Sequence, residues 1–461
     1  MQLINLYNSL TRTKELLRGQ HSPAIKIYVC GMTVYDYCHI GHARVLVFFD
    51  SFVRVLKLLG YEPYYVRNVT DIDDKIINKS KEMGLECQQI TSRFIEAMLE
   101  DETSLGVSRP DVLPKATECI PQMIEMIQRL LEQKKAYQTP EGDVCYSVGS
   151  FDSYGSLANQ KLDQLLQGHR VGVDTSKQHP LDFVLWKTSK EGEPCWDSPF
   201  GKGRPGWHIE CSAMATHFLG DTIDIHGGGL DLKFPHHENE IAQAEGANNQ
   251  TFVKHWMHVG HVQIDNEKMS KSLGNFITIR DILHQYEAET VRYFILSSHY
   301  RSPLSYSTSR LDQSRQALSR MYLSIKDVPD YPDAFESSFT QRFKKVLMDD
   351  VNVPGALVEL FGLVKKINQH KLNQDMEAAS KCVKELKTLA GVLGLLLSDP
   401  TSFLQGKLKV DEAYVQQQID ARNKARSERD YDKADQIRDE LLAMGIELED
   451  SVSGTTWRSV V

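Results

Sequence analysis

Residues 25–69 constrain the fold more than any other part of the sequence. Residues 25–30 form a short β-branched run, a glycine-containing turn follows, and an apolar-periodic stretch then extends to Gly60, a residue type that commonly ends helices. Residues 64–69 have the pattern of a second strand. A strand, a helix and a second strand in this order predict a parallel sheet with a right-handed crossover. Since ligands of such sheets bind at the carboxyl ends of the strands, we expect a site near Cys30 and residues 68–74.

The middle of the chain contains an insertion and then returns to the α/β pattern. Pro110 and Pro114 interrupt the pattern, and an insertion that holds a helix at residues 117–135 is expected to extend to about residue 203. After it, the sequence predicts a strand at 222–226, a turn at 227–229, a helix start within 236–244, and a further strand at 259–264 that leads into residues 268–275.

The last third of the chain changes character. From about residue 311 to residue 397 apolar residues recur at helical spacing, as in a helical bundle. A connection at 398–406 precedes a charged helix at 411–444 and a short strand-like tail. We therefore expect a Rossmann-like parallel-sheet domain at 1–310 with its insertion at about 110–203, an α-helical bundle at 311–400, and a small C-terminal domain at 405–461.

The composition indicates a folded multidomain protein. Of 461 residues, 41% are hydrophobic and 25% are charged, which is too apolar for a disordered chain. Charged residues interrupt both the opening stretch, where a signal peptide would be apolar, and the most apolar long run, at 45–59. A cytoplasmic protein with no membrane span is therefore expected. The eight cysteines include no CxxC pair, so most are predicted to be reduced core thiols.

The sequence His39-Ile40-Gly41-His42 stands where the first strand passes into the predicted helix. The unpaired N–H groups and the positive dipole end of a helix start can receive phosphate. His39 and His42 are three residues apart and share a face, and Gly41 allows a nucleotide to approach the backbone. The pattern predicts a phosphate site, but a helix cap beside a solvated histidine would look the same.

A second motif, Lys268-Met269-Ser270-Lys271-Ser272, follows another predicted strand. Its two lysines can offset the charge that builds as pyrophosphate leaves, although a lysine-serine loop alone is usually a solvated turn. In this order on an α/β frame, the HIGH and KMSKS sequences resemble the signature pair of class I aminoacyl-tRNA synthetases. The resemblance implies that His39, His42, Lys268 and Lys271 are catalytic. It also implies an ATP site, with Mg²⁺, at His39, Gly41, His42, Lys268, Ser270 and Lys271.

Four residues far apart in the sequence are candidate metal ligands. Cys30 ends the first strand, Cys211 lies in the sequence GWHIEC, and His236 and Glu240 are four residues apart at a predicted helix start, where they can present an imidazole and a carboxylate to one point. Two thiolates, an imidazole and a carboxylate form a plausible zinc set. Buried thiols beside a helix-surface pair would explain the same pattern, and the spacing leaves His237 and Glu238 open as competing ligands.

The stretches 30–36, 68–75, 206–212 and 226–240 resemble cysteinyl-tRNA synthetases at nearly every position. In that family the matching residues hold one zinc ion per chain, which implies Cys30, Cys211, His236 and Glu240 as ligands here. The resemblance also implies that Thr70, Trp207 and His226 line a cysteine pocket and that Asp231 reaches the ammonium group. From residue type alone, a tryptophan is more often a core residue, and His226 beside three glycines is equally explained by its turn.

The C-terminal tail resembles the anticodon-reading module of the same family. Because the net charge is −9, any RNA contact must be local rather than spread over a basic surface. The resemblance implies that Arg426 pairs with base edges or stacks, that Asp435 and Asp450 accept from base amino groups, and that Trp457 stacks on an unpaired base. Without it, the charged helix is simply a solvated helix with i,i+4 pairs.

The resemblance extends from residue 6 to residue 457 and implies a cysteine–tRNA ligase activity on L-cysteine, ATP and tRNA(Cys), in a protein expected to be monomeric. Two other functions share part of the pattern. A ligase of the same fold that attaches cysteine to an amino sugar would keep the zinc site and both motifs but would lack the tail. A non-catalytic RNA-binding paralogue with a structural zinc would have no need for His39, His42 or Lys271.

Overall fold

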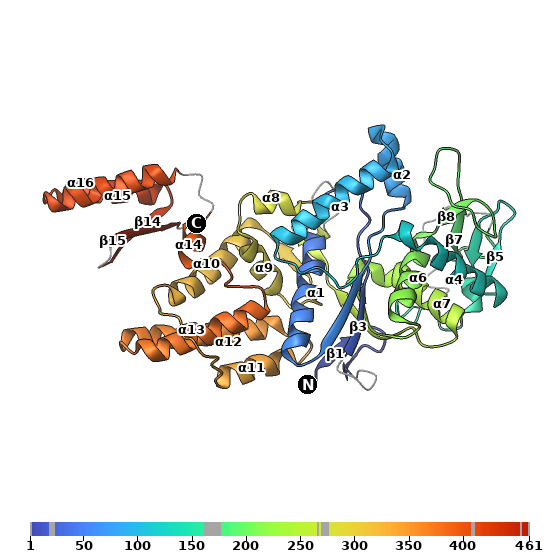
Figure 1. Ribbon diagram of the computed structural model, residues 1–461, viewed down its shortest axis with the longest axis horizontal. Coiled ribbons are helices and arrows are strands. Elements are labelled where there is room, and N and C mark those ends of the chain that lie inside the picture. Colours follow the sequence, from blue (N-terminus) through green and yellow to red (C-terminus); the bar gives the residue numbers. More distant parts are fainter. Residues whose placement is uncertain are drawn as a thin grey trace. The chain divides into compact units, whose positions relative to one another are not determined.

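The computed structural model describes residues 2–17, 24–160, 177–264, 267–268, 276–406, 411–451 and 454–459 (Figure 1). The chain divides into two compact units. One comprises Met1–Ile279 with Ser298–Ser305 and Lys345–Asn352, and the other comprises Arg280–Ser297, Tyr306–Lys344 and Val353–Val461. The ranges of the three domains expected from the sequence stay predictions.

The first unit is built on a parallel sheet, which confirms the predicted fold class. Its strands are β3 (Ala24–Val29), β4 (Glu62–Arg67), β9 (Ile223–Gly229) and β10 (Val253–Val259), in the order β10-β9-β3-β4. The chain runs outward from β3 to β4 on one side and from β9 to β10 on the other. The strand order therefore reverses between β3 and β9, and such a point opens a crevice at the carboxyl ends of the strands.

Helix α1 (Ile40–Leu58) connects β3 to β4 (Figure 1). Its buried aromatic residues pack on the sheet, and the ring of Phe49 lies so close to Gly227 that a Cβ on Gly227 would meet it at 2.1 Å. The predicted turn at residues 227–229 was wrong, because these glycines continue β9 to its end. Glycine is needed there because the strand is covered closely by neighbouring side chains.

The insertion forms an antiparallel sheet of β5 (Ala136–Gln138), β6 (Val144–Tyr146), β7 (Phe183–Thr188) and β8 (Gly203–Pro205). Helix α4 (Ile120–Glu132) packs its buried apolar face against α6 (Trp207–Leu219) and α7 (Glu238–Asn248). The other α-helices and strands described in this part of the chain are β1 (Asn5–Asn8), β2 (Thr13–Leu16), α2 (Asp74–Met83), α3 (Cys87–Ser104), β11 (Val262–Ile264) and β12 (Glu267–Lys268).

The strand predicted at residues 259–264 is two strands. Val259 ends β10, and β11 begins after Gly260 and His261 and pairs antiparallel with β12. A Cβ on Gly260 would lie 2.5 Å from the carbonyl oxygen of Ser302, so the backbone passes too close to a neighbouring segment to continue in the parallel sheet.

The second unit contains the predicted helical bundle. Helices α12 (Val353–Leu372) and α13 (Met376–Val392) lie side by side (Figure 1), and α10 (Thr308–Ile325) packs on α9, α12 and α14. The other helices described between residues 279 and 406 are α8 (Ile279–Leu283), α9 (Ala288–Leu296), α11 (Ser338–Leu347) and α14 (Pro400–Gln405), and a short strand, β13, spans Leu304–Tyr306.

The end of the chain forms two helices and a hairpin. The single helix predicted at 411–444 was wrong: α15 (Glu412–Ser427) and α16 (Tyr431–Ala443) are separated by Arg429, whose φ of 65° is incompatible with a continuous right-handed helix. Strands β14 (Ile446–Ser451) and β15 (Gly454–Ser459) pair antiparallel. The apolar side chains between these elements form a separate small core of Val415, Ile419, Ile437, Leu441, Ile446 and Trp457.

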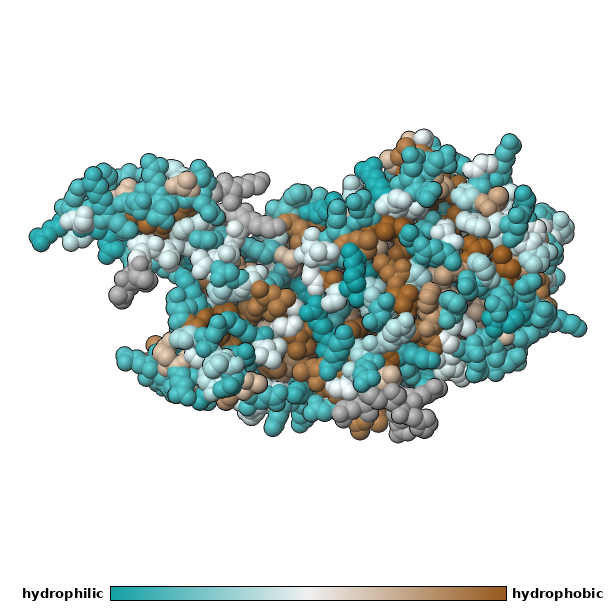
Figure 2. All heavy atoms as spheres, in the orientation of Figure 1, coloured by the Kyte–Doolittle hydropathy of each residue, from teal (hydrophilic) through white to brown (hydrophobic). Residues whose placement is uncertain are grey.

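The described helices include none that is long and apolar enough to cross a bilayer. Hydrophilic side chains cover most of the face drawn in Figure 2.

Candidate active site and metal centre

A pocket of 320 Å³ opens at the carboxyl ends of the parallel strands. Its wall includes Cys30 just after β3, Thr70 just after β4, Gly229 at the end of β9 and Val259 at the end of β10. The crevice predicted from the strand order therefore exists, and the first residues of α1 line it as well.

The two histidines of the HIGH sequence lie together beside this pocket. Their rings stack with centroids 3.6 Å apart and planes inclined by 12°. His39 caps α1, because its Nδ1 accepts the N–H groups of Gly41 (3.1 Å) and His42 (3.3 Å). The expectation that the helix start offers unpaired N–H groups was therefore wrong: the imidazole satisfies them, and the pocket meets the histidine rings and Gly41.

The KMSKS sequence is only partly described. The backbone of Lys268 ends β12 and pairs with Gln263 of β11. The side chain of Lys268 and the whole of residues 269–275, which include Ser270 and Lys271, lie outside the described residues.

The four proposed metal ligands converge at one point. The ligand atoms of Cys30, Cys211, His236 and Glu240 all lie within 4.8 Å of one another and are buried. Cys30 Sγ is 3.2 Å from Glu240 Oε1, and His236 Nε2 is 3.2 Å from the same oxygen. His236 Nδ1 pairs with His208 Nδ1 at 3.0 Å, which directs Nε2 toward the group.

A second group overlaps the first. Cys30 and Glu240 also lie within 4.8 Å of ligand atoms of His226 and His237, so the structure keeps His237 as a candidate ligand. The two groups differ in position, because Cys30, Cys211 and His236 line the pocket whereas His226 and His237 are buried and do not. Glu238 belongs to neither group, since its carboxylate accepts the backbone N–H groups of Gly155 and Ala158.

The electrostatics of the first group favour a bound cation. Burial, reinforced by the neighbouring Cys211, raises the pKa of the Cys30 thiol well above its usual range, and burial raises the pKa of Glu240 likewise. Burial also holds the pKa of His236 well below its usual range. Glu240 Oε2 accepts no hydrogen bond within the described chain, although His226 Nε2 lies 3.4 Å from it. A divalent cation would supply the missing partner and stabilise the thiolates and the carboxylate.

Of the four residues expected to bind an amino acid, three line the pocket and one is buried. Thr70, Trp207 and Asp231 line the pocket. Trp207 is 37% exposed and its ring packs 4.4 Å from that of His236, so it is a pocket wall and not a core residue. His226 was also expected to line the pocket, but it is completely buried and is not among the lining residues; its Nε2 lies 3.4 Å from Cys30 Sγ.

Two polar residues that contact Thr70 were given no role in the sequence analysis, although residue 68 lies in the stretch expected to form the site. Glu210 is completely buried and accepts the hydroxyl proton of Thr70 over 2.9 Å, and Asn68 bonds to Thr70 from the other side. The spacing of α6 held a signal for the first, because Trp207, Glu210 and Cys211 are three and four residues apart and share a helix face.

The C-terminal residues expected to bind RNA differ in exposure and in their partners. Asp435 is exposed, and Arg426 is partly exposed and pairs with Asp450 at 2.8 Å. Asp450 also binds the guanidinium of Arg422 through two bonds of 2.9 Å, which holds its pKa well below the usual range. Trp457 is 8% exposed and packs in the small core, so most of its ring is covered by that core, and its stacking on a base stays a prediction.

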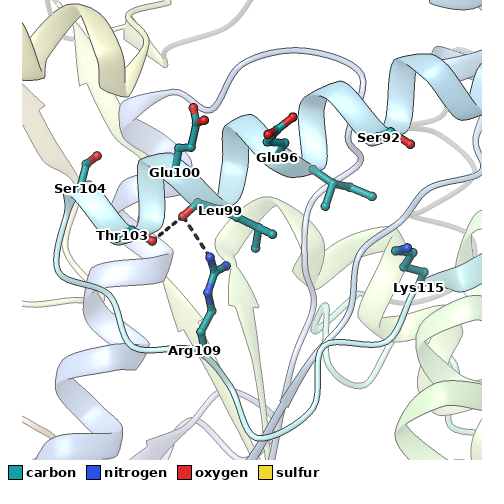
Figure 3. A pocket seen from close by; sticks show the side chains of 9 residues that line it. Ser92, Glu96, Leu99, Glu100, Thr103, Ser104, Arg109 and Lys115 are labelled. Carbon is teal, nitrogen blue, oxygen red and sulfur yellow. Dashed lines mark hydrogen bonds between the residues drawn. The ribbon is translucent and has the colours of Figure 1, made fainter.

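Another hollow, of 610 Å³, lies along α3 and the segment that follows it (Figure 3). The carbonyl oxygen of Leu99 accepts bonds there from Thr103 Oγ1 and Arg109 Nη2. None of the described residues that were predicted to act in catalysis, metal binding or substrate binding lines it.

Comparison with known proteins decides the family. The model for the tRNA synthetases class I (C) catalytic domain matches residues 17–316, that of the DALR domain matches 342–398, and that of the cysteinyl-tRNA ligase anticodon binding domain matches 412–458. The chain is 52% identical to the cysteine–tRNA ligase of Laribacter hongkongensis, over 99% of this chain and 100% of that protein. It is 53% identical to the cysteine–tRNA ligase of Methylococcus capsulatus, with the same coverage.

The chain belongs to the cysteine–tRNA ligase family of class I tRNA synthetases. The predicted resemblance is thereby confirmed. Among solved structures, the Mycobacterium tuberculosis methionyl-tRNA synthetase in complex with methionyl-adenylate aligns with a TM-score of 0.59 over 80% of this chain and 89% of that one. At 14% identity that similarity shows the shared class I fold alone.

Proposed function

We propose that the chain acts as a cytoplasmic, monomeric cysteine–tRNA ligase. It would activate L-cysteine with ATP to cysteinyl-adenylate, releasing pyrophosphate. It would then pass the cysteinyl group to a hydroxyl of the 3′-terminal ribose of tRNA(Cys), releasing AMP. The observation that carries the proposal is that the two thiols and the imidazole of the metal group face the same pocket as the stacked histidines of the HIGH sequence. The family membership supports the same activity.

His39 and His42 would meet the phosphate end of ATP. Because the N–H groups of Gly41 and His42 are already occupied by His39, the imidazoles and not the helix amides would contact phosphate, while Gly41 leaves room for the nucleotide. Lys268 and Lys271, with Ser270, would neutralise charge on the departing pyrophosphate, together with the Mg²⁺ that accompanies ATP.

Cys30, Cys211, His236 and Glu240 would hold one zinc ion. Sulfur, nitrogen and oxygen donors in this combination suit zinc, and the Glu240 oxygen that accepts no hydrogen bond fits a metal ligand. When bound, zinc supplies a soft Lewis acid that binds a thiolate much more strongly than a hydroxyl group. Trp207 would close the pocket over the amino acid, and Thr70 and Asp231 would bind its ammonium group.

The C-terminal domain would bind the anticodon. Arg426 and Asp435 are accessible to RNA, and Arg426 can exchange its pair with Asp450 for a base edge or a phosphate. The presence of this domain favours tRNA over an amino sugar as the acceptor.

The test is pyrophosphate exchange with each of the twenty amino acids, followed by aminoacylation of total tRNA. We expect exchange with cysteine, none above background with serine, and charging of one tRNA species. Exchange with cysteine but transfer only to an amino sugar would establish the rival ligase. A protein that binds tRNA and exchanges with no amino acid would be the non-catalytic paralogue.

A further inference from the structure

The hydroxyl group of Thr70 is part of a chain of hydrogen bonds. The first donor, the backbone N–H of Gly31, determines which group donates and which accepts at each following bond. The backbone N–H of Gly31 can only donate, and it donates to Asn68 Oδ1 over 2.8 Å. This bond orients the amide, so that Asn68 Nδ2 faces Thr70 Oγ1 at 3.3 Å. An amide nitrogen has only protons to offer, and Thr70 Oγ1 therefore accepts from Asn68.

Glu210 ends the chain. Its carboxylate is completely buried, and Oε2 accepts the hydroxyl proton of Thr70 over 2.9 Å. A hydroxyl group has one proton and two lone pairs. With the proton committed to Glu210 and one lone pair to Asn68, the second lone pair is what Thr70 offers to a ligand in the pocket that it lines.

The backbone keeps Thr70 in this position. Its N–H donates to the carbonyl oxygen of Met32 over 3.2 Å, and its own carbonyl oxygen accepts from Val34 over 3.1 Å. Gly31 allows the two segments to come together, because a Cβ there would lie 1.7 Å from the carbonyl oxygen of Asn68. Hydrogen bonds on both sides of Cα fix the backbone of Thr70. The direction of its O–H bond is then set by the hydrogen bond to Glu210.

We infer that Glu210 is a positioning residue that presents Thr70 to the pocket as a hydrogen-bond acceptor, and that this end of the pocket thereby selects a primary ammonium group. An ammonium has three protons and no lone pair, so it matches an acceptor. A freely rotating hydroxyl group could instead donate its proton to the carboxylate of the amino acid, which would then bind in the reverse orientation. Glu210 excludes that arrangement and leaves the carboxylate of the amino acid directed away from Thr70.

The inference deepens the proposed function and rests on it, since it concerns the binding of an amino acid in the same pocket. A purely structural role of Glu210 makes a different prediction. Loss of a buried structural carboxylate would disturb the pocket for every ligand alike, whereas loss of an orienting carboxylate affects only ligands that carry the ammonium group.

The experiment uses the full metal-loaded chain with Glu210→Gln and measures equilibrium binding of three thiols. Cysteine carries both polar groups, 2-aminoethanethiol keeps the ammonium, and 3-mercaptopropionate keeps the carboxylate. Since a hydrogen bond to a charged group is worth about tenfold or more in affinity, we expect the dissociation constants of cysteine and 2-aminoethanethiol to rise at least about tenfold. That of 3-mercaptopropionate should change by less than about threefold, because it makes no such bond.

Three single substitutions and one double substitution serve as controls. Thr70→Val removes the acceptor and should repeat the pattern, and adding Glu210→Gln to it should cause no further loss. Thr70→Ser keeps the hydroxyl group and should restore most of the affinity for cysteine and 2-aminoethanethiol that Thr70→Val loses. Glu245→Gln alters a half-buried carboxylate that accepts from the N–H of Phe252, outside the pocket, and should leave all three unchanged.

Equal weakening of all three thiols, or no change for any of them, would overturn the inference. If Glu210→Gln fails to fold, Thr70→Val against Thr70→Ser decides by the same criterion. The proposed function fails separately, in the unaltered chain, if pyrophosphate exchange selects another amino acid. The three-ligand comparison is then made with that amino acid, its amine and its deaminated acid.

Discussion

Gly31 occupies a position that no other residue type fits. It directly follows the proposed ligand Cys30, and a Cβ there would overlap the carbonyl group of Asn68. We expect Gly31→Ala to lower the free energy of unfolding of the first unit by about 1 to 3 kcal/mol, because the backbone of Asn68 must shift. The loss of the hydrogen bond to Asn68 should also weaken cysteine binding. Hydrogen exchange of residues 24–160 at increasing denaturant concentration measures the change in the free energy of unfolding.

Gly149→Ala is the matched control. The space around Gly149 is open to 4 Å and its φ is not positive, so the same added methyl group should leave stability within about 0.5 kcal/mol. Equal stability of both variants would show that the segment after β3 adapts easily, and the argument from close approach would be wrong.

Cys211 contributes one of two thiols to the proposed zinc site, and serine is nearly the same size but a far poorer zinc ligand. We expect Cys211→Ser to reduce bound zinc from about one ion per chain to a small fraction of that and to abolish cysteine-dependent pyrophosphate exchange. Metal analysis after dialysis against a chelator measures the first, and an exchange assay measures the second.

Cys195→Ser is the corresponding control, since Cys195 is exposed and belongs to neither ligand group. It should keep its zinc and its exchange activity. If Cys211→Ser also keeps both, the group of Cys30, His226, His237 and Glu240 would be the better candidate for the metal.

At the scale of elements, the sequence predicted the regular parts of the fold better than their ends. The strand, helix and strand of residues 25–69 are present because their apolar periodicity matches one buried sheet and one covering helix. The predicted turn at 227–229 failed because glycine signals a turn locally, whereas here it serves the close packing of Phe49 on Gly227. Such packing joins residues far apart in sequence and leaves no local pattern.

Arg429 shows a second limit of local patterns. The charge pattern of residues 411–444 is continuous, but the chain reverses at Arg429, which has a positive φ, and two helices pack on one small core. We expect Arg429→Gly to raise the stability of this domain by about 0.5 to 1 kcal/mol, because glycine adopts the left-handed conformation without the steric cost. Hydrogen exchange of residues 412–458 in the full chain measures it.

Arg438→Gly provides a control of opposite sign. Arg438 is exposed in the middle of α16, where glycine should destabilise the helix by about 1 kcal/mol. If both substitutions destabilise equally, the positive φ of Arg429 carries no strain, and the helix break has another cause.

At the scale of the whole molecule, the proposed site depends on residues that only the fold brings together. Cys30 and Glu240 are more than two hundred positions apart, and their meeting follows from the reversal of strand order between β3 and β9. The residue types and the family resemblance named the ligand set, but not Glu210 or Asn68, whose roles depend on the direction of hydrogen bonds behind the pocket. A sequence pattern gives residue types and their spacing, but it does not show which group donates and which accepts in a hydrogen bond.

The catalytic pocket and the C-terminal residues belong to different parts of the chain. The pocket, the HIGH histidines and the metal group lie entirely in the first unit, whereas residues 412–459 form a core of their own. Deletion of residues 410–461 should leave cysteine-dependent pyrophosphate exchange within about twofold, because no group of the pocket is removed. It should raise the KM for tRNA at least about tenfold, which corresponds to about 1.4 kcal/mol of lost binding.

Exchange and aminoacylation are measured side by side on the shortened chain, and circular dichroism checks the helical bundle, because the deletion also removes the ion pair of Lys326 with Glu449. Asp435→Asn in the full chain tests the same surface without any truncation, and it should raise the KM for tRNA while leaving exchange unchanged. A parallel loss of exchange and charging in the shortened chain would mean that the C-terminal domain supports the catalytic fold. An unchanged KM for tRNA would mean that it does not bind the anticodon.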